Sequence, residues 1–381
     1  MKYPALFTLF AFPILVFSQH NTYYIGHSGF GWDLIVGEMV NDLAADAGID
    51  TYEYGFQFIG GTCLANQWFN HTEPQGGTDS HIELQTGDYD MLVLAEQIPI
   101  QEVILGSQFC NENVITSYQS VDNFYDMAIE ANASTQVYLM EFHNEIDLTG
   151  NDPYQTWIDL NSTMRPLWEQ VADSVSEINI GSDIRIVPVS AAFQAMVDSV
   201  RAGVFPGITD WLELFDSNDA PEATIHPTEM TYYLAACVHF ATIFQESPEG
   251  LTNETFAAAG WQFDPPTVAQ AAMMQAIAWQ VVSTDPYAIP PIVMSIETEL
   301  EAENHIEIYP NPFTDKITIH TTKSFKDACF KIYQLDGKLI FQELNITGNK
   351  TSIQPTMKLE GIYFFEVTDG NRRFKGRLIA N

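Results

Sequence analysis

The run Asp90-Met91-Leu92-Val93-Leu94-Ala95 is the stretch that decides the fold of this chain. After its first residue it is apolar without interruption, which is typical of a β-strand buried on both faces of a sheet. Residues 136–142 have a similar character. A sheet covered on both faces needs helices on both sides, so these runs predict a parallel α/β sheet.

Strand-like and helix-like segments alternate on either side of this run. The expected strands are residues 22–25, 51–58, 90–95, 136–142 and 184–189. The expected helices, which include the segments with apolar residues at helical spacing, are residues 33–47, 114–131, 164–178, 191–202, 228–245 and 268–282. This βαβ rhythm predicts one α/β domain over residues 20–284. Ligands of such sheets bind at the carboxyl ends of the strands, so chemistry is expected just after each strand.

A serine follows the first expected strand, in Gly26-His27-Ser28-Gly29. At this position its hydroxyl would lie at the mouth of the sheet. The free amides of the next helix would lie beside it and could stabilise an oxyanion. Ser28 is therefore a candidate nucleophile, and a purely capping or turn-forming role for it is equally open.

Three further strand ends carry polar or flexible residues. Gly61, in Gly60-Gly61, could bring a backbone N–H close to a ligand, or form a plain turn. Gln97 could donate a side-chain amide hydrogen to an oxyanion, with Glu96 beside it as an orienting or accepting group. His143 could contact substrate or pair with a neighbouring carboxylate for structural reasons.

A late histidine, His226, follows an acidic loop and precedes an expected helix. A histidine delivered from such a loop can act as general base for an early serine, with a carboxylate holding its tautomer. Asp219 and Glu222 are the candidate carboxylates. The alternative is a His-Pro turn that only caps the helix.

Together these segments resemble the SGNH hydrolase superfamily. Gly26-His27-Ser28 matches its nucleophile motif, Gly61 matches the glycine after the second strand, and His226-Pro227 precedes the matching helical segment Tyr233-Leu234-Ala235-Ala236. The resemblance implies a flavodoxin-like parallel sheet flanked by helices and a serine esterase mechanism without a cofactor. Ser28 would be the nucleophile and His226 the base. The N–H groups of Ser28 and Gly61 and the amide of Gln97 would bind the oxyanion.

Two positions depart from the pattern of that superfamily. Its third block ends in Gly-x-Asn, where this chain has Ala95-Glu96-Gln97, so Gln97 replaces the asparagine or that donor is missing. Its last block has an aspartate three residues before the histidine, where this chain has Ala223. Asp219 or Glu222 could support His226 from a longer loop, or Ser28 and His226 could act as a dyad. These departures leave a non-catalytic binding protein of the same fold, on the cell surface, as the alternative to an esterase.

Residues 304–381 differ in composition from the rest of the chain. They contain 11 of the 15 Lys and Arg residues and have a formal charge of +3, whereas the preceding residues have a formal charge of −38. Such a step marks a domain boundary. Short alternating runs, with Asp336-Gly337 and Asp369-Gly370 between them, predict a small all-β sandwich of about six or seven strands.

This tail resembles the type A C-terminal sorting domain of the type IX secretion system. The matching motifs are Tyr309-Pro310-Asn311-Pro312-Phe313, residues 331–337 and Gly361-Ile362-Tyr363-Phe364. The resemblance implies export across an outer membrane, with the secretion machinery as a partner and a secreted or cell-surface location. An adhesive or carbohydrate-binding sandwich is the alternative.

The first 18 residues have the pattern of a secretory signal peptide. A lysine at position 2 precedes an apolar run, and Ser18 offers a cleavage position. Residues 285–303 are the expected linker. No other uncharged apolar run approaches the ~20 residues that span a bilayer, so no transmembrane segment is expected in the mature chain. Export permits a disulfide, for which Cys63 and Cys110 are the first candidates, whereas Cys237 is expected to be a buried thiol.

The charge distribution limits the partners. A catalytic region with so few cations repels nucleic acid and anionic lipid headgroups, so neutral or cationic small substrates or neutral glycans are expected. The His, Cys, Asp and Glu spacings do not predict a metal site. The sequence therefore predicts a secreted esterase acting on O-acetyl groups of glycans or on other small esters.

Overall fold

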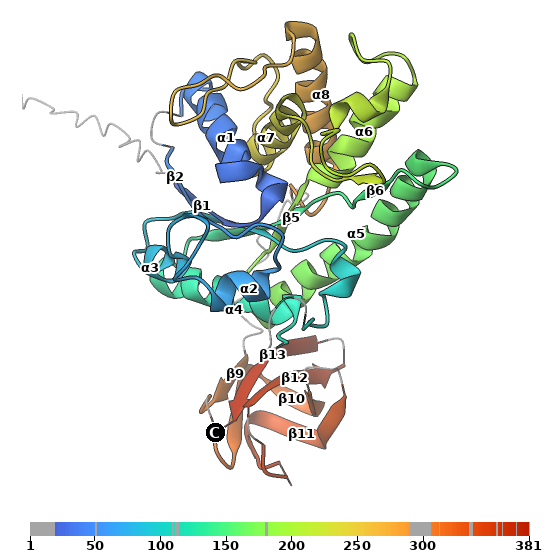
Figure 1. Cartoon of the computed structure of the whole chain (residues 1–381). Helices are drawn as coiled ribbons and strands as arrows, with labels where there is room; N and C mark the ends of the chain where they lie inside the picture. The colour runs from blue at the N-terminus through green and yellow to red at the C-terminus, as the bar shows by residue number, and fades with distance from the viewer. Residues whose placement is uncertain are drawn as a thin grey trace, which may run out of the picture.

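The computed structural model describes residues 20–289, except 50–51, 109, 111–113 and 180–181, and residues 306–380, except 312, 335–337, 356, 360 and 371. The described residues form a large α/β unit and a smaller antiparallel β unit (Figure 1). Each unit has its own cluster of buried apolar side chains.

The α/β unit is built on a six-stranded sheet in the order β3-β2-β1-β4-β5-β7. The strands are β1 (Thr22–Gly26), β2 (Tyr54–Phe58), β3 (Gly76–Gly77), β4 (Met91–Ala95), β5 (Gln136–Glu141) and β7 (Arg185–Pro188). All neighbouring strands are parallel except the edge strand β3. The parallel strands follow the flavodoxin-like order 2-1-3-4-5, which confirms the predicted fold class. β1 and β4 are buried along their whole length, which confirms the burial that the apolar run of β4 predicts.

Helices cover both faces of this sheet (Figure 1). One layer consists of α1 (Ile35–Asp46), α6 (Val189–Arg201), α7 (Glu229–Phe244) and α8 (Val268–Thr284). The other consists of α2 (Leu64–Phe69), α3 (Ser80–Leu84), α4 (Ser117–Ala131) and α5 (Pro153–Ile178). A short two-stranded sheet, β6 (Ile146–Asp147) with β8 (Ala223–Thr224), lies outside the main sheet.

The structure contains the helices predicted from the sequence, but the predicted length of one of them is wrong. α5 begins at Pro153, well before the predicted start at residue 164. Asp152 caps it by accepting a hydrogen bond from the backbone N–H of Gln155, and proline is favoured in the first turn, so a start signal was present in the sequence. Pro166 lies inside the helix. The short helices α2 and α3 were not predicted.

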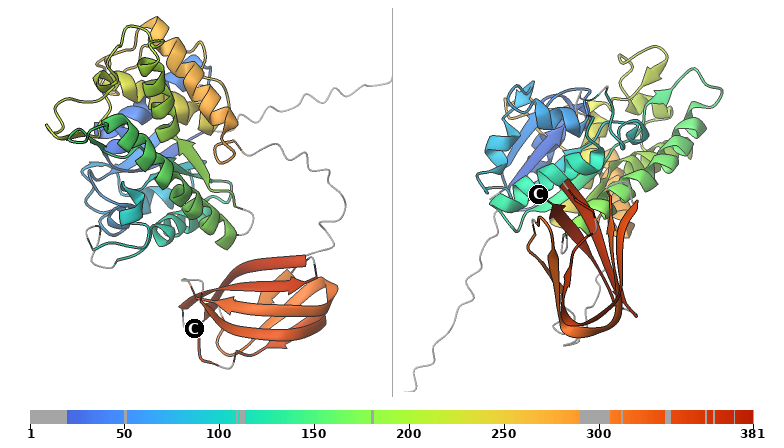
Figure 2. Two further views of the ribbon diagram at one scale, coloured as in Figure 1. Left: turned by 90° about the vertical axis from the view of Figure 1, so that its right-hand side faces the viewer. Right: turned by 90° about the horizontal axis from the view of Figure 1, so that it is seen from below.

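The C-terminal unit is a five-stranded antiparallel sheet folded over its own core (Figure 2). Its strands are β9 (Ile306–Tyr309), β10 (Ile317–Tyr333), β11 (Leu339–Ile353), β12 (Gly361–Asp369) and β13 (Arg372–Ala380). The number is lower than the six or seven predicted because β10 and β11 are long and continue through several register shifts. The turn residues Asp336 and Gly337 lie outside the described residues, but the strands on either side pair as a hairpin, with Tyr333 opposite Leu339.

The cysteines follow the sequence expectation. Cys63 and Cys110 form a disulfide with their Cα atoms 5.6 Å apart, and Cys237 is a buried free thiol. The predicted signal peptide, and residues 290–303 of the predicted linker, lie outside the described residues. In the described ranges, no helix is both long and apolar enough to cross a membrane.

Candidate active site

The candidate nucleophile Ser28 lies two residues beyond the end of β1, at the start of a short 3-10 helix, Ser28–Phe30. Glycine is required at the end of the strand, because a Cβ on Gly26 would lie 2.6 Å from the Cβ of Ala95. The buried ring of His27 caps the turn. Its Nδ1 accepts a hydrogen bond from the Gly29 N–H at 3.1 Å, and its Nε2–H donates to the Glu96 carbonyl at 3.0 Å. Burial lowers the pKa of His27, which favours the neutral ring that this pair of bonds requires.

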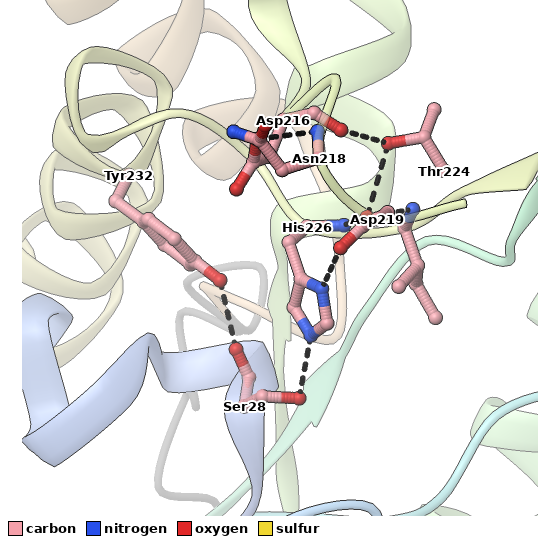
Figure 3. Close-up of polar contacts among 8 residues, drawn as sticks. Ser28, Asp216, Asn218, Asp219, Thr224, His226 and Tyr232 are labelled. Atoms are coloured by element: carbon pink, nitrogen blue, oxygen red, sulfur yellow. Dashed lines mark hydrogen bonds and ion pairs between the residues drawn. The ribbon is translucent and has the colours of Figure 1, made fainter. Parts of the chain in front are cut away.

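Ser28 is in direct contact with His226, although 198 residues separate them in sequence. The Nε2 atom of His226 lies 2.9 Å from Ser28 Oγ (Figure 3). The histidine reaches Ser28 from the loop between β8 and α7, and both residues are partly buried. The structure therefore brings together the two residues for which the sequence predicts nucleophile and base.

Asp219 holds the other side of the His226 ring. Its Oδ1 lies 2.6 Å from His226 Nδ1, and its Oδ2 accepts hydrogen bonds from the backbone N–H groups of Ile225 and His226, both at 2.8 Å. Burial alone would raise the pKa of the Asp219 carboxyl, but these hydrogen bonds lower it below its ordinary value. An ionised Asp219 fixes the proton of His226 on Nδ1 and leaves Nε2 free to accept the Ser28 hydroxyl proton.

The loop of residues 216–226 explains how an aspartate seven residues before the histidine can reach it. The Asp216 N–H donates to the His226 carbonyl at 2.8 Å, which closes the loop at its base. The hydroxyl of Thr224 donates to the Asp216 carbonyl at 3.0 Å and to Asp219 Oδ2 at 3.1 Å (Figure 3). Glu222, the other candidate carboxylate, is exposed, and its carbonyl accepts a hydrogen bond from the Leu148 N–H. Of the two carboxylates left open by the sequence, the structure places Asp219 against His226.

Tyr232 is a further contact that sequence reasoning did not identify. It lies in the first turns of α7 and is buried, and its hydroxyl donates to the Ser28 carbonyl at 2.8 Å (Figure 3). Helix α7 therefore follows the candidate base His226 in the chain and also contacts the candidate nucleophile Ser28. Its position just before the Tyr233-Leu234-Ala235-Ala236 segment was visible in the sequence, but the direction of its side chain depends on how α7 packs.

Gly61 lies in the loop between β2 and α2, with a φ of 62°, a conformation that favours glycine. The buried carboxylate of Glu96 braces this loop. Its Oε1 accepts hydrogen bonds from the Leu64 N–H at 2.9 Å and the Gln97 N–H at 2.8 Å. The disulfide at Cys63 also ties the loop to residue 110. Glu96 thus has the accepting role that the sequence left open for it, toward backbone groups.

Two predicted site residues lie elsewhere. The side-chain amide of Gln97 donates to the Ile98 carbonyl at 3.3 Å, and none of its contacts among the described residues is with Ser28 or His226. The ring of His143 is fully buried, and its Nδ1 lies 2.8 Å from the Asn144 carbonyl. Burial lowers its pKa to about 4. The predicted substrate contact of His143 is therefore wrong, because aromatic rings such as those of Trp157 and Phe215 enclose it.

The indole of Trp32 borders the site and was also missed. Its ring centroid lies 6.2 Å from that of His226 and 6.0 Å from that of Phe58, and the residue is 62% exposed. Trp32 follows Ser28 closely in the sequence, so its place beside the candidate nucleophile could have been predicted.

The cations of the described part of the α/β unit are all engaged with its own side chains. Arg165 contacts Glu141 at 2.7 Å, and also Glu169 and Asp285. Arg185 pairs with Asp183, and the guanidinium of Arg201 lies 3.4 Å from the ring centroid of Tyr154. Across the described ranges, no group of three or more His, Cys, Asp or Glu side chains is arranged to hold a metal ion.

The C-terminal unit matches a known family. Residues 307–381 match the secretion system C-terminal sorting domain. The tail is a sorting domain of type IX secretion. This confirms the resemblance noted in its sequence motifs. The matched residues belong to the C-terminal unit and do not include the α/β unit.

Solved structures similar to the chain include three from bacteria. A DUF4886 family protein from Bacteroides uniformis has a TM-score of 0.46 and 15% identity, covering 70% of this chain and 95% of that one. An acetylxylan esterase from Geobacillus stearothermophilus has a TM-score of 0.38 and 14% identity, covering 61% and 96%. A lipase/acylhydrolase from Enterococcus faecalis has a TM-score of 0.35 and 12% identity, covering 60% and 98%. Similarity at this level does not bear on activity. No curated protein matches the chain in sequence.

Proposed function

We propose that the α/β unit is a serine esterase that is exported by means of its C-terminal sorting domain. The observation that carries the proposal is the continuous chain Ser28 Oγ–His226–Asp219, with contacts of 2.9 Å and 2.6 Å. Hydroxyl, imidazole and carboxylate in this order are the arrangement that activates a serine for acyl transfer. They also lie where β1 ends, which is the ligand-binding edge of an open parallel sheet.

The proposed reaction has two stages. Ser28 Oγ attacks the ester carbonyl carbon while its proton passes to His226 Nε2, and the resulting tetrahedral oxyanion collapses when His226 gives that proton to the departing alcohol. A water molecule then attacks the acyl group on Ser28, transferring a proton to His226. When the acid leaves, this proton returns to Ser28 Oγ. The charged Asp219 stabilises the imidazolium formed in both stages.

The backbone N–H groups of Ser28 and Gly61 are the proposed oxyanion donors. No acceptor among the described residues takes a hydrogen bond from either group. The side-chain amide of Gln97 donates to the Ile98 carbonyl at 3.3 Å and does not contact Ser28 or His226, so we do not include Gln97 as a third donor. That observation supports the second candidate function, a surface protein of the same fold that binds esters or glycans without cleaving them.

Hydrolysis of p-nitrophenyl acetate separates the two candidates. The purified α/β unit with its tail should release p-nitrophenol, and Ser28→Ala should reduce turnover by about 10⁴-fold or more. A Ser217→Ala variant serves as the control, since Ser217 lies in the same loop as Asp219 and is exposed. Unchanged turnover in Ser28→Ala would rule out the esterase assignment, and absence of turnover in the intact protein would favour the binding protein.

Glycan O-acetyl groups are the substrate class that we propose for an exported esterase of this charge. The residues before the tail have a formal charge of −38, and the described arginines are engaged in internal contacts. An anionic substrate would meet repulsion without a guanidinium or ammonium group to bind it. Neutral acetylated sugars meet no such penalty.

A further inference from the structure

We propose that Trp32 is a stacking platform for a neutral sugar ring of the substrate, and so determines preference for sugar esters over simple esters. This inference rests on the proposed esterase function. It concerns a residue that takes no part in the Ser28–His226–Asp219 chain. The occupant is the ring that carries the ester, or the one next to it.

Trp32 is an exposed tryptophan next to the candidate base. Single exposed apolar residues are common on protein surfaces and need no explanation by themselves. Trp32, however, is 62% exposed with its ring centroid 6.2 Å from that of the candidate base His226. The departing alcohol takes its proton from His226 in the proposed reaction, so a sugar ring on that alcohol would lie within reach of this indole.

The local backbone holds the indole in the open. Phe30 and Leu34, on either side of Trp32, are each only 1% exposed and anchor the segment in the core. Residues with positive φ flank Trp32: Gly31 has a φ of 82°, and Leu34 has a φ of 65° in the left-handed helical conformation. For a leucine this conformation is unfavourable and persists only where the surroundings enforce it. The indole is thus held on a constrained segment, with the buried Phe58 ring 6.0 Å away on one side.

The chemistry of the surroundings selects a sugar ring. The C–H face of a pyranose is apolar and flat enough to lie on an aromatic ring, while its hydroxyl groups stay in water. A long acyl chain would instead need a concave, mostly apolar pocket. The Trp32 ring is exposed to solvent and does not line an enclosed pocket of that kind. Anionic ligands are disfavoured, because the cations of the described α/β residues are engaged elsewhere.

The test compares two esters that differ only in the alcohol. One is a methyl β-D-glucopyranoside monoacetate, and the other is ethyl acetate, with acid release followed in a pH-stat. Nitrophenyl esters are avoided here because their own ring could stack on Trp32. Trp32→Ala should lower kcat/KM for the sugar ester by about 10- to 30-fold, as removal of an aromatic anchor does, and leave that for ethyl acetate nearly unchanged. Trp32→Phe should recover part of the loss.

A matched control is available in Trp261. It is 59% exposed, and its ring contacts no other aromatic ring within the described residues. Trp261→Ala should leave kcat/KM unchanged for both esters. An equal fall for both esters in Trp32→Ala would show that the indole only supports His226, and no fall for the sugar ester would also overturn the proposal.

Failure of the esterase function can be told apart from failure of this inference. If the intact protein hydrolyses neither ester, binding of an unacetylated oligosaccharide, cellotriose, is measured by tryptophan fluorescence in the intact chain, Trp32→Ala and Trp261→Ala. Loss of the ligand-dependent change in Trp32→Ala alone would support the platform. An equal response in all three proteins, or none, would contradict it.

Discussion

Two histidine–aspartate pairs in the α/β unit are nearly identical in geometry and exposure. His226 Nδ1 lies 2.6 Å from Asp219, with side chains 25% and 16% exposed, and His71 Nδ1 lies 2.7 Å from Asp79, with side chains 24% and 18% exposed. Each aspartate also accepts a backbone N–H, and the pKa of each carboxyl is lowered overall by its hydrogen bonds, against the opposing effect of burial.

The pairs differ in what lies beyond the imidazole. His226 presents Nε2 to Ser28 Oγ at the carboxyl end of β1. The His71 ring is stacked on that of His81, with centroids 3.6 Å apart, near the edge strand β3. A histidine–aspartate pair is therefore not a sign of catalysis in this fold. We propose a catalytic role for the first pair, through its serine, and a structural role for the second.

The largest expected effect comes from removing each imidazole. His226→Ala should lower kcat on p-nitrophenyl acetate by about 10⁴-fold or more, because Ser28 loses its proton acceptor. His71→Ala should leave kcat unchanged within error. Comparable losses in the two variants, with both proteins folded by circular dichroism, would remove the distinction between the pairs.

Neutralising each aspartate is the next test. Asp219→Asn should lower kcat by roughly 10³- to 10⁴-fold, since the amide no longer fixes the proton on His226 Nδ1. Asp79→Asn should not change kcat. It should cost less than about 1 kcal/mol in the free energy of unfolding measured with urea, because asparagine still caps α3 and the lost ion pair is partly exposed. If Asp219→Asn retains wild-type kcat, Ser28 and His226 act as a dyad.

Two buried tyrosines allow a matched comparison in which the expected effect on kcat is smaller. Tyr232 donates to the Ser28 carbonyl at 2.8 Å, whereas Tyr23 donates to the Thr78 carbonyl, next to Asp79, at 3.0 Å. Replacing either by phenylalanine should cost about 0.5–1.5 kcal/mol of stability. Only Tyr232→Phe should also lower kcat, by about 10-fold, because it loosens the turn that carries the nucleophile. A kcat loss of that size in Tyr23→Phe would indicate general loosening of the sheet instead.

The smallest effect concerns acid stability near the second pair. Burial, followed by the neighbouring His71, lowers the pKa of His81 to about 4. The folded state thus favours the neutral ring, so this contribution is present above about pH 6.5 and is lost as the pH falls toward 4. His81→Gln should flatten the decline of Tm between pH 6.5 and 4 without altering kcat at pH 7. An unchanged Tm profile would show that His81 does not contribute to it.

Much of the fold and the central contact could be predicted from sequence. Uninterrupted apolar runs such as 91–95 identify strands buried on both faces, and the rule that ligands bind at strand carboxyl ends places Ser28 at the site. The His-Pro sequence before an expected helix indicated His226 as the candidate base. The contact between two residues 198 positions apart followed from this topology rather than from any local pattern.

The remaining parts depend on packing that no single segment encodes. Asp219 could not be chosen over Glu222, because the choice follows from how Asp216 and Thr224 close the loop. The Gln97 side chain bonds to Ile98, in a turn where the buried Glu96 takes the N–H groups of Leu64 and Gln97. His143 was misplaced because its aromatic enclosure comes from α5 and from residue 215, which are distant in sequence.

The most direct test of the account is covalent labelling of the intact protein with a fluorophosphonate probe, read by peptide mass spectrometry. We expect one adduct, on Ser28, formed at a rate that His226→Ala reduces by orders of magnitude and His71→Ala leaves unchanged. A folded protein that takes up no label at Ser28, or labels it equally well without His226, would contradict the claim that this serine is an activated nucleophile.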